Sequence, residues 1–202
     1  MIILPGVLHL EQWYSTSTEL EDNVLVGVSE SGYSNDELSL SWLRHSERFS
    51  ARRQLGTYQL LLLDGYGSHC TKEFIEFCDD HNIILFCLPP HTAHLLQPLD
   101  VVVFQPYKHY HAEAVDAATR TGCSDFNKVE FLAAIHSIRR QTFEWSTIIS
   151  AFLQTGLIPY NPAIVLDRLG SSPEPTTSDS QHPNTHWHSA ITNIDAAYCA
   201  IP

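Results

Sequence analysis

The sequence predicts an α/β fold in which a parallel strand pair with a crossover helix is followed by C-terminal helices. Three observations predict it. A nearly continuous apolar run covers residues 58–63. A second apolar run covers residues 83–88, after a segment with helical spacing over 71–80. Beyond Pro98 the helical spacing returns and continues for most of the remaining chain.

The amino-terminal fifty residues predict two strands and one helix. Residues 1–10 and 24–29 are rich in aliphatic side chains and read as strands. Residues 36–50 carry apolar side chains at helical spacing, and Asn35 precedes them as an N-cap. Two acids follow Asn35 in the first turn, where the helix dipole favours negative charge.

The run at 58–63 is interrupted only by Gln59, a pattern typical of a strand buried on both faces. Thr71 can cap the helix that follows, and the run at 83–88 predicts the second strand. A strand, a helix and a strand within about thirty residues indicate a right-handed crossover and therefore a parallel pair.

The carboxyl-terminal half predicts helices and then a tail. The helices are expected over 101–115, 126–141, 145–155 and 163–169, with Gly156 at the C′ position of the third. From residue 170 the composition shifts to Ser, Thr, Pro and His, which predicts a disordered tail over 170–202 after a domain of residues 1–169.

Composition narrows the function classes. The chain has 202 residues, of which 44% are hydrophobic and 17% charged, as expected for a globular domain. Its net charge of −12 argues against a nonspecific nucleic-acid binder. Five cysteines without a CxxC pair predict reduced thiols inside a cell. Since no run approaches about 18 apolar residues, no membrane partner is expected.

Two aspartates carry the predicted chemistry. Asp64 follows the strand at 58–63 and is expected at its carboxyl edge, where parallel α/β sheets bind ligands. Asp100 follows a Pro/His loop and is expected in the first turn of a helix. Two carboxylates brought together there could hold Mg²⁺ or Mn²⁺. The alternatives are an ordinary Asp-Gly turn at Asp64 and a helix-dipole partner at Asp100.

The same segments resemble the DDE superfamily endonuclease domain of pogo-like transposases, which includes the Jerky and centromere-protein-B groups, in a form similar to fungal versions. The resemblance covers roughly residues 1–169. It rests on the following stretches: Val28–Asn35, Trp42-Leu43, Leu61-Leu62-Leu63-Asp64-Gly65-Tyr66-Gly67-Ser68-His69, Ile83-Ile84-Leu85, Leu88-Pro89-Pro90-His91-Thr92-Ala93-His94-Leu95-Leu96-Gln97-Pro98-Leu99-Asp100-Val101, Phe104–Lys108, Ala151-Phe152 and Thr155–Pro162.

The resemblance implies an RNase H-like fold with three acidic metal ligands. Asp64 matches the second ligand and Asp100 the third. The first belongs to an Asp-Glu-Thr/Ser-Gly segment on an opening strand that this sequence does not supply, and Glu30 and Asp36 align elsewhere. The fold is therefore expected to be incomplete and amino-terminally truncated. Any Mg²⁺ or Mn²⁺ is expected to bind weakly.

Further side chains acquire roles from the resemblance. His69 and His94 would support the ligands or face a phosphate, and Lys108, Arg139 and Arg140 could contact nucleic acid. The alternative for each of these three cations is an ordinary solvated helix charge. DNA is the implied partner and the nucleus the implied location, with the cytosol otherwise.

Two functions follow. One is a transposon-derived endonuclease domain that binds DNA and is catalytically incomplete. The other is a domesticated, non-catalytic remnant that acts as a scaffold, meeting protein partners or a second copy of itself.

Overall fold

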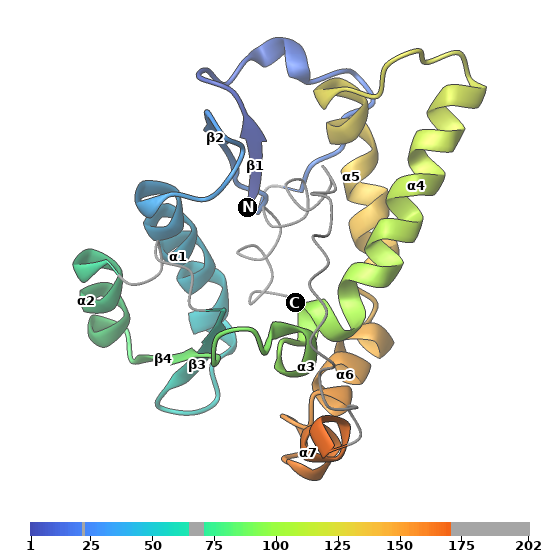
Figure 1. The fold of residues 1–202 in the computed structure, drawn as a ribbon. Coiled ribbons are helices and arrows are strands. Elements are labelled where there is room, and N and C mark those ends of the chain that lie inside the picture. Colours follow the sequence, from blue (N-terminus) through green and yellow to red (C-terminus); the bar gives the residue numbers. More distant parts are fainter. Residues whose placement is uncertain (22, 65–70, 171–202) are drawn as a thin grey trace, which may run out of the picture.

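The computed structural model describes residues 1–21, 23–64 and 71–170. Their strands and helices follow one another as Figure 1 shows. In chain order they are β1 (Ile2–Pro5), η1 (Glu11–Trp13), β2 (Val26–Ser29), α1 (Asp36–Ser50), η2 (Ala51–Arg53), β3 (Gln59–Leu63), α2 (Lys72–Asp80), β4 (Ile83–Cys87), α3 (Ala93–Leu96), η4 (Leu99–Val103), α4 (Phe104–Arg120), α5 (Lys128–Thr142), α6 (Trp145–Gln154) and α7 (Ala163–Gly170). The predicted tail over 171–202 lies outside the described residues.

The strands form two separate parallel pairs, β1 with β2 and β3 with β4. In the second pair Gln59 lies opposite Ile83, and the register runs on to Leu63 opposite Cys87. The predicted parallel pair with its crossover helix is therefore confirmed. The first strand is shorter than predicted. It ends at Pro5, and the Gly6 N–H makes one further bond to the Ser29 carbonyl at 2.8 Å before the chain leaves the pair.

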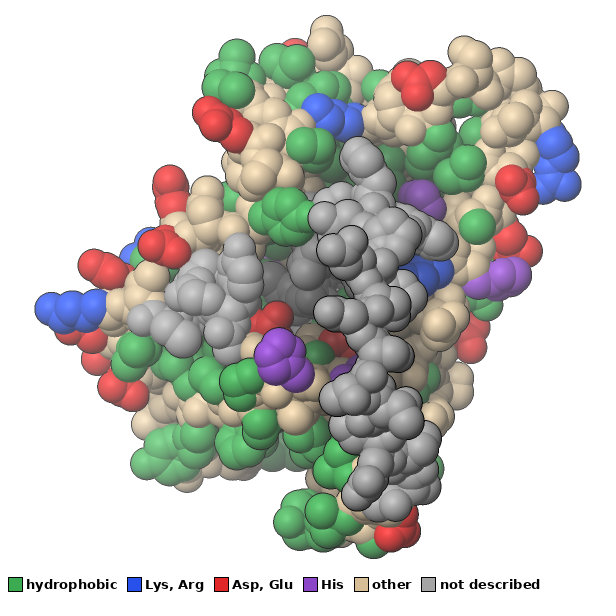
Figure 2. All heavy atoms as spheres, in the orientation of Figure 1, with side chains coloured by type: hydrophobic (Ala, Val, Ile, Leu, Met, Phe, Trp, Pro, Cys, Tyr) green, Lys and Arg blue, Asp and Glu red, His purple; other side chains and the backbone are tan. Residues whose placement is uncertain are grey.

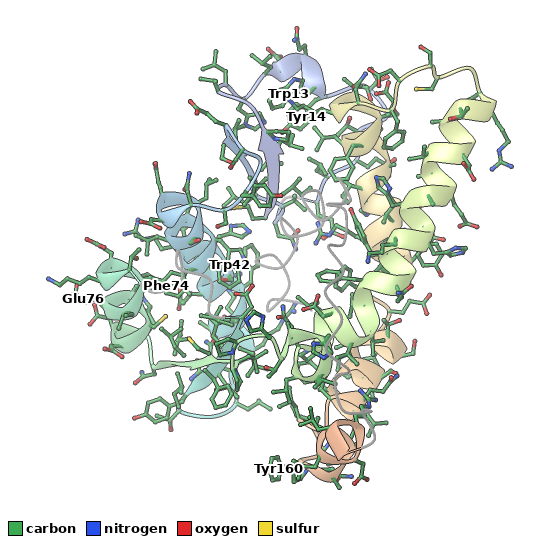
Figure 3. All side chains as sticks on the ribbon, viewed as in Figure 1. Trp13, Tyr14, Trp42, Phe74, Glu76 and Tyr160 are labelled. Carbon is green, nitrogen blue, oxygen red and sulfur yellow. The ribbon has the colours of Figure 1, made fainter. Side chains whose placement is uncertain are left out.

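One core joins the two pairs. Side chains of β1, α1, β3, α2 and β4 pack together in it, among them Ile3, Trp42, Leu61 and Phe74. Figure 3 shows Trp42 on α1 and Phe74 on α2 on the side of the strands that these two helices cover. Both helices begin as predicted, since the Asn35 side chain accepts the Leu38 N–H at 2.8 Å and Thr71 accepts the Phe74 N–H at 3.3 Å.

The other face of β3 and β4 is open in the described part of the chain. Leu60 is 61% exposed, and Ile84 and Phe86 are about half exposed. The prediction of a strand buried on both faces is therefore wrong. Helices α1 and α2 lie on one face only, and a run of four leucines cannot show which alternate residues face solvent. Figure 2 shows apolar side chains gathered on the surface over this region.

The helical half packs as a hairpin of α4 and α5 with α6 against η4. Tyr107, Ile135 and Ile138 are buried between α4 and α5. Asn127 and Glu130 form a capping box at the start of α5. Helix α6 ends at Gln154 with Thr155 as its C-cap, and the predicted Gly156 follows at C′ with a positive φ of 68°. No helix within the described residues is long and apolar enough to cross a bilayer.

This mixed α/β architecture is compatible with part of the RNase H-like fold that the resemblance implies.

Candidate metal and nucleic-acid site

The site is built where β3 and β4 end. Asp64 directly follows β3 and is half-buried. Beside it, Leu88 continues the ladder after β4 by donating its N–H to the Leu63 carbonyl at 2.7 Å. Both chain segments thus leave the sheet at the same carboxyl edge, the edge at which parallel α/β sheets bind ligands.

The loop from Pro89 to Gln97 turns the chain towards the next helix. Thr92 donates its hydroxyl to the Pro89 carbonyl at 2.7 Å, and His91 takes a positive φ of 63° between them. The short helix α3 follows, and the Val101 N–H bonds to the Gln97 carbonyl at 3.0 Å. Local hydrogen bonds therefore fix the path that leads to Asp100.

Asp100 lies in η4, a π-helical turn that runs directly into α4. The sequence predicts a helix start here, and the structure adds that the turn is π-helical. Single π turns recur at functional sites, because the extra residue redirects side chains. Helix α6 packs against η4 and supports this turn.

The two aspartates are electrostatically coupled. Burial raises the pKa of Asp100, and the charge of Asp64 raises it further. The charges of Lys108 and His94 act in the opposite direction and lower this pKa. Three further residues that the sequence singles out, Asp64, His94 and Lys108, therefore lie within electrostatic reach of Asp100.

The remaining predicted site residues lie elsewhere or outside the description. His69 falls in residues 65–70, which are outside the described residues. Arg139 is half-buried on α5 and lies near the Met1 amine, whose pKa is lowered to about 5, first by burial and then by Arg139. Arg140 is exposed on the same helix. The charges that act on the pKa of Asp100 are those of Asp64, Lys108 and His94, and neither arginine is among them.

Sequence reasoning missed Gln97. Its side chain is buried between α3 and η4, and its Oε1 has no hydrogen-bond partner within the described residues. A glutamine between two leucines and a proline carries no signal of that burial.

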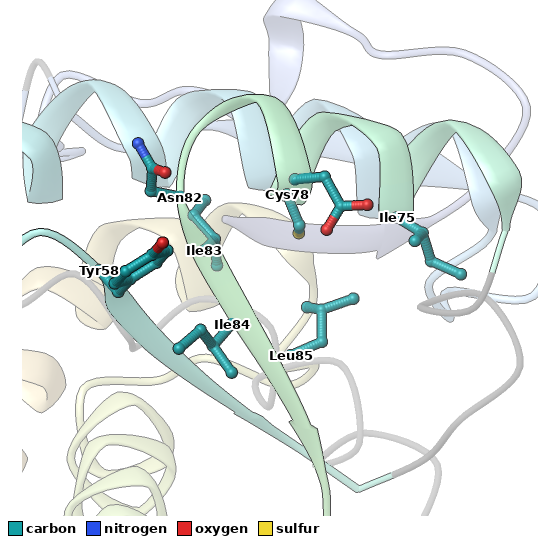
Figure 4. A pocket seen from close by; sticks show the side chains of 8 residues that line it. Tyr58, Ile75, Cys78, Asn82, Ile83, Ile84 and Leu85 are labelled. Atoms are coloured by element: carbon teal, nitrogen blue, oxygen red, sulfur yellow. The ribbon is translucent and has the colours of Figure 1, made fainter.

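The carboxylates do not line the apolar pocket between α2 and β4. A pocket of about 320 Å³ lies between α2 and β4, lined mainly by apolar side chains such as Tyr58, Ile75 and Ile83 (Figure 4). Tyr58 and Ile83 lie at the amino ends of β3 and β4, opposite the edge that holds Asp64, whereas Ile75 comes from α2.

The donor set suits a divalent cation but is small. Carboxylate oxygens are the ligands that Mg²⁺ and Mn²⁺ prefer, and a cation between Asp64 and Asp100 would relieve their repulsion. Among the described residues no group of three or more His, Cys, Asp or Glu side chains could hold a metal ion. The described residues therefore bring two carboxylates, those of Asp64 and Asp100, to the carboxyl edge of β3 and β4.

Comparisons with known proteins match the part of the chain that contains Asp64 and Asp100. A family model described as DDE superfamily endonuclease matches residues 1–152. A protein of Cochliobolus lunatus named MFS-type transporter clz9 is 32% identical over 168 residues, which is 83% of this chain. A human protein named Pogo transposable element with ZNF domain is 23% identical over 110 residues, or 54% of this chain.

The chain spans 18% of the length of the fungal relative and 8% of that of the human relative. No solved structure matches it.

Proposed function

The chain belongs to the DDE superfamily endonuclease family, and from that premise we propose that it is a transposase-type domain that binds DNA and holds one divalent cation between Asp64 and Asp100. The observation that carries this proposal is the coupling of the two carboxylates across the loop and the π-helical turn. The human relative named for a pogo transposable element supports the transposase type. The nucleus is the location that this function requires.

The divalent cation, when bound, would activate a water or hydroxyl for attack on a phosphodiester and stabilise the developing charge. The protein residues have simpler tasks. Asp64 and Asp100 would hold the cation from two elements, and η4 orients the second carboxylate. Lys108, two turns beyond Asp100 on α4, is exposed and would meet a phosphate, while its charge lowers the pKa of Asp100.

We further propose that these residues alone are catalytically incomplete. In-line phosphoryl transfer depends on positioning, and two ions need more carboxylates than the two found here. The described residues bring no third acid to the edge. The transporter name of the fungal relative is not carried over, because the match covers 18% of that protein.

Cation binding and nicking test this function in the full chain. Manganese should bind weakly, seen as loss of the free Mn²⁺ signal in electron paramagnetic resonance, and Asp64→Asn and Asp100→Asn should each abolish that loss. Asp116→Asn makes the same chemical change at an exposed site on α4 and should have no effect.

Plasmid DNA should bind but remain uncut in Mn²⁺. Nicking that disappears in both aspartate variants would refute the incompleteness, whereas nicking that survives in both would remove these carboxylates from the site.

A scaffold function is the second candidate, and the open face of β3 and β4 favours it. Exposed apolar side chains there, together with the net charge of −12, suit a protein partner better than DNA. Failure of the wild-type chain to bind duplex DNA would favour this function.

A further inference from the structure

Four arginines project from the end of α1 and from the turn that continues it. Arg44, Arg48, Arg52 and Arg53 are all exposed, and together they are called the arginine ridge. They are four of the 11 basic residues of a chain with net charge −12, gathered into ten positions that contain one acid, Glu47. The ridge is thus a basic island on an acidic protein.

The spacing of the ridge aligns its charges. Arg44, Arg48 and Arg52 follow one another at intervals of four residues, which places them on one side of the α1–η2 segment. Successive members lie about 6 Å apart along the axis, because each residue rises about 1.5 Å. Long guanidinium side chains at that interval can contact successive phosphates along a nucleic-acid strand.

A purely structural role does not account for the ridge. Basic residues near a helix C-terminus interact favourably with its dipole, but that effect falls off within the last turn. It covers Arg48 at the end of α1 and Arg52 and Arg53 at the end of η2, but not Arg44, which lies a full turn before Arg48. None of the four arginines takes part in an ion pair within the described residues. Like charges at four-residue spacing destabilise a helix, so this arrangement weakens α1 unless an anion binds to it.

The ridge is separate from the carboxylate site. The Gln59 side chain at the start of β3 donates to the Gln54 side chain at 2.8 Å, so the end of the ridge lies beside the amino end of that strand. Asp64 lies at the opposite end of β3, about 16 Å along the strand. Acids farther than about 8 Å are largely screened at physiological salt, so the ridge can attract a polyanion despite the acidic net charge.

We infer that the arginine ridge is a second DNA contact, which binds the phosphate backbone of a duplex away from the carboxylates. The inference rests on the proposed function in that the partner is DNA. Backbone contacts hold a duplex in register without reading its sequence. A mildly acidic domain would in this way keep hold of DNA while a different part of the duplex meets Asp64 and Asp100.

The salt dependence of binding tests the inference. Fluorescence anisotropy with a labelled duplex of arbitrary sequence gives the slope of log affinity against log salt for the full chain. Each lost phosphate contact should lower the magnitude of that slope by about 0.9. The double variant Arg48→Gln/Arg52→Gln should therefore lose about 1.8 from the slope and about tenfold or more in affinity at low salt.

The matched control carries the same change in charge at exposed arginines elsewhere. Arg120→Gln/Arg168→Gln, on α4 and α7, should keep the wild-type slope. Arg48→Lys/Arg52→Lys should retain most of the affinity because it keeps the charge. In the absence of DNA, Arg48→Gln/Arg52→Gln should unfold at the wild-type temperature or slightly above it, because it relieves like-charge repulsion in α1. All variants should still bind Mn²⁺ as wild type does.

Each outcome decides a different point. Equal slopes for the two Arg→Gln pairs would overturn the DNA assignment of the ridge and leave the carboxylate function standing. Absence of duplex binding by the wild-type chain would overturn both proposals.

Discussion

Asp100 is the residue whose surroundings say most about function. It is half-buried, it faces the charge of Asp64, and Lys108 and His94 only partly offset both effects. A structural carboxylate is normally placed where its charge is stabilised, whereas this one is placed where its charge is destabilised. A carboxylate whose charge is disfavoured both by burial and by a second carboxylate marks a functional-site candidate.

The raised pKa of Asp100 predicts how pH acts on stability. A carboxyl group whose pKa is higher in the folded state favours folding while it is protonated, and that stability is lost as the pH rises through the folded-state pKa. Asp100→Asn should therefore unfold at a higher temperature than wild type at pH 7, with the advantage shrinking as the pH falls towards 3.8, the ordinary value for Asp.

Thermal unfolding at a series of pH values checks this prediction. Millimolar Mg²⁺ should stabilise wild type and leave Asp100→Asn unchanged. A variant that is less stable than wild type at pH 7 would show that the Asp100 carboxylate is held by favourable contacts instead.

Adjacent residues of β3 provide a second test at this scale. Leu61 is 5% exposed and packs in the core with α1 and α2, whereas Leu60 is 61% exposed on the open face. Leu61→Ala should lower the free energy of unfolding by about 2–5 kcal/mol, because it leaves a cavity. Leu60→Ala should cost under about 1 kcal/mol.

Urea denaturation of the two variants measures the difference. Equal losses in the free energy of unfolding would mean that the outer face of the β3–β4 pair is also covered in solution, as the uninterrupted run of leucines first suggested.

The elements around the site owe their positions to short-range chemistry. The sequence predicts the N-caps Asn35 and Thr71, and helices begin there as expected. It also predicts that the chain becomes helical after Pro98 and that a helix stops before Gly156. The π-helical geometry of η4 and the burial of Gln97 could not be predicted from the sequence, because both depend on how α6 and α3 pack against that turn. Local signals predict element boundaries, whereas tertiary packing decides side-chain direction.

The connection after α6 predicts a sensitive glycine. A Cβ on Gly156 would clash with the carbonyl oxygen of Asn161, and the residue has a φ of +68°. Gly156→Ala should therefore lower the free energy of unfolding by more than about 2 kcal/mol, because it adds backbone strain and a clash.

Gly122→Ala is the matched control, because Gly122 also has a positive φ, of +94°, but has no atom within 4 Å of such a Cβ. Gly122→Ala should lower the free energy of unfolding by only about 1–2 kcal/mol, because backbone strain is then the sole effect. Equal losses in chemical denaturation would mean that the segment around Asn161 moves away without cost.

At the scale of the whole molecule, one core ties both strand pairs to α1 and α2, and a second set of contacts ties β1 and β2 to the helical hairpin. The parallel register of β3 and β4 could be predicted, because a crossover helix leaves few topologies. That β1 and β2 pair with each other and not with β3 could not, since strand pairing across sequence gaps leaves no local pattern. The net charge of the whole chain could not indicate the arginine ridge, because it sums acidic and basic surfaces that act separately.

The central claim is that Asp64 and Asp100, from two separate elements, form one cation site. Replacing Mg²⁺ with Fe²⁺, adding ascorbate and peroxide, and mapping backbone cuts by mass spectrometry tests it most directly, because hydroxyl radicals cleave only near the bound iron. We predict cuts close to both residue 64 and residue 100, absent in Asp64→Asn and in Asp100→Asn and kept in Asp116→Asn. Cleavage beside only one of the two aspartates, or cleavage that survives both substitutions, would contradict a shared site.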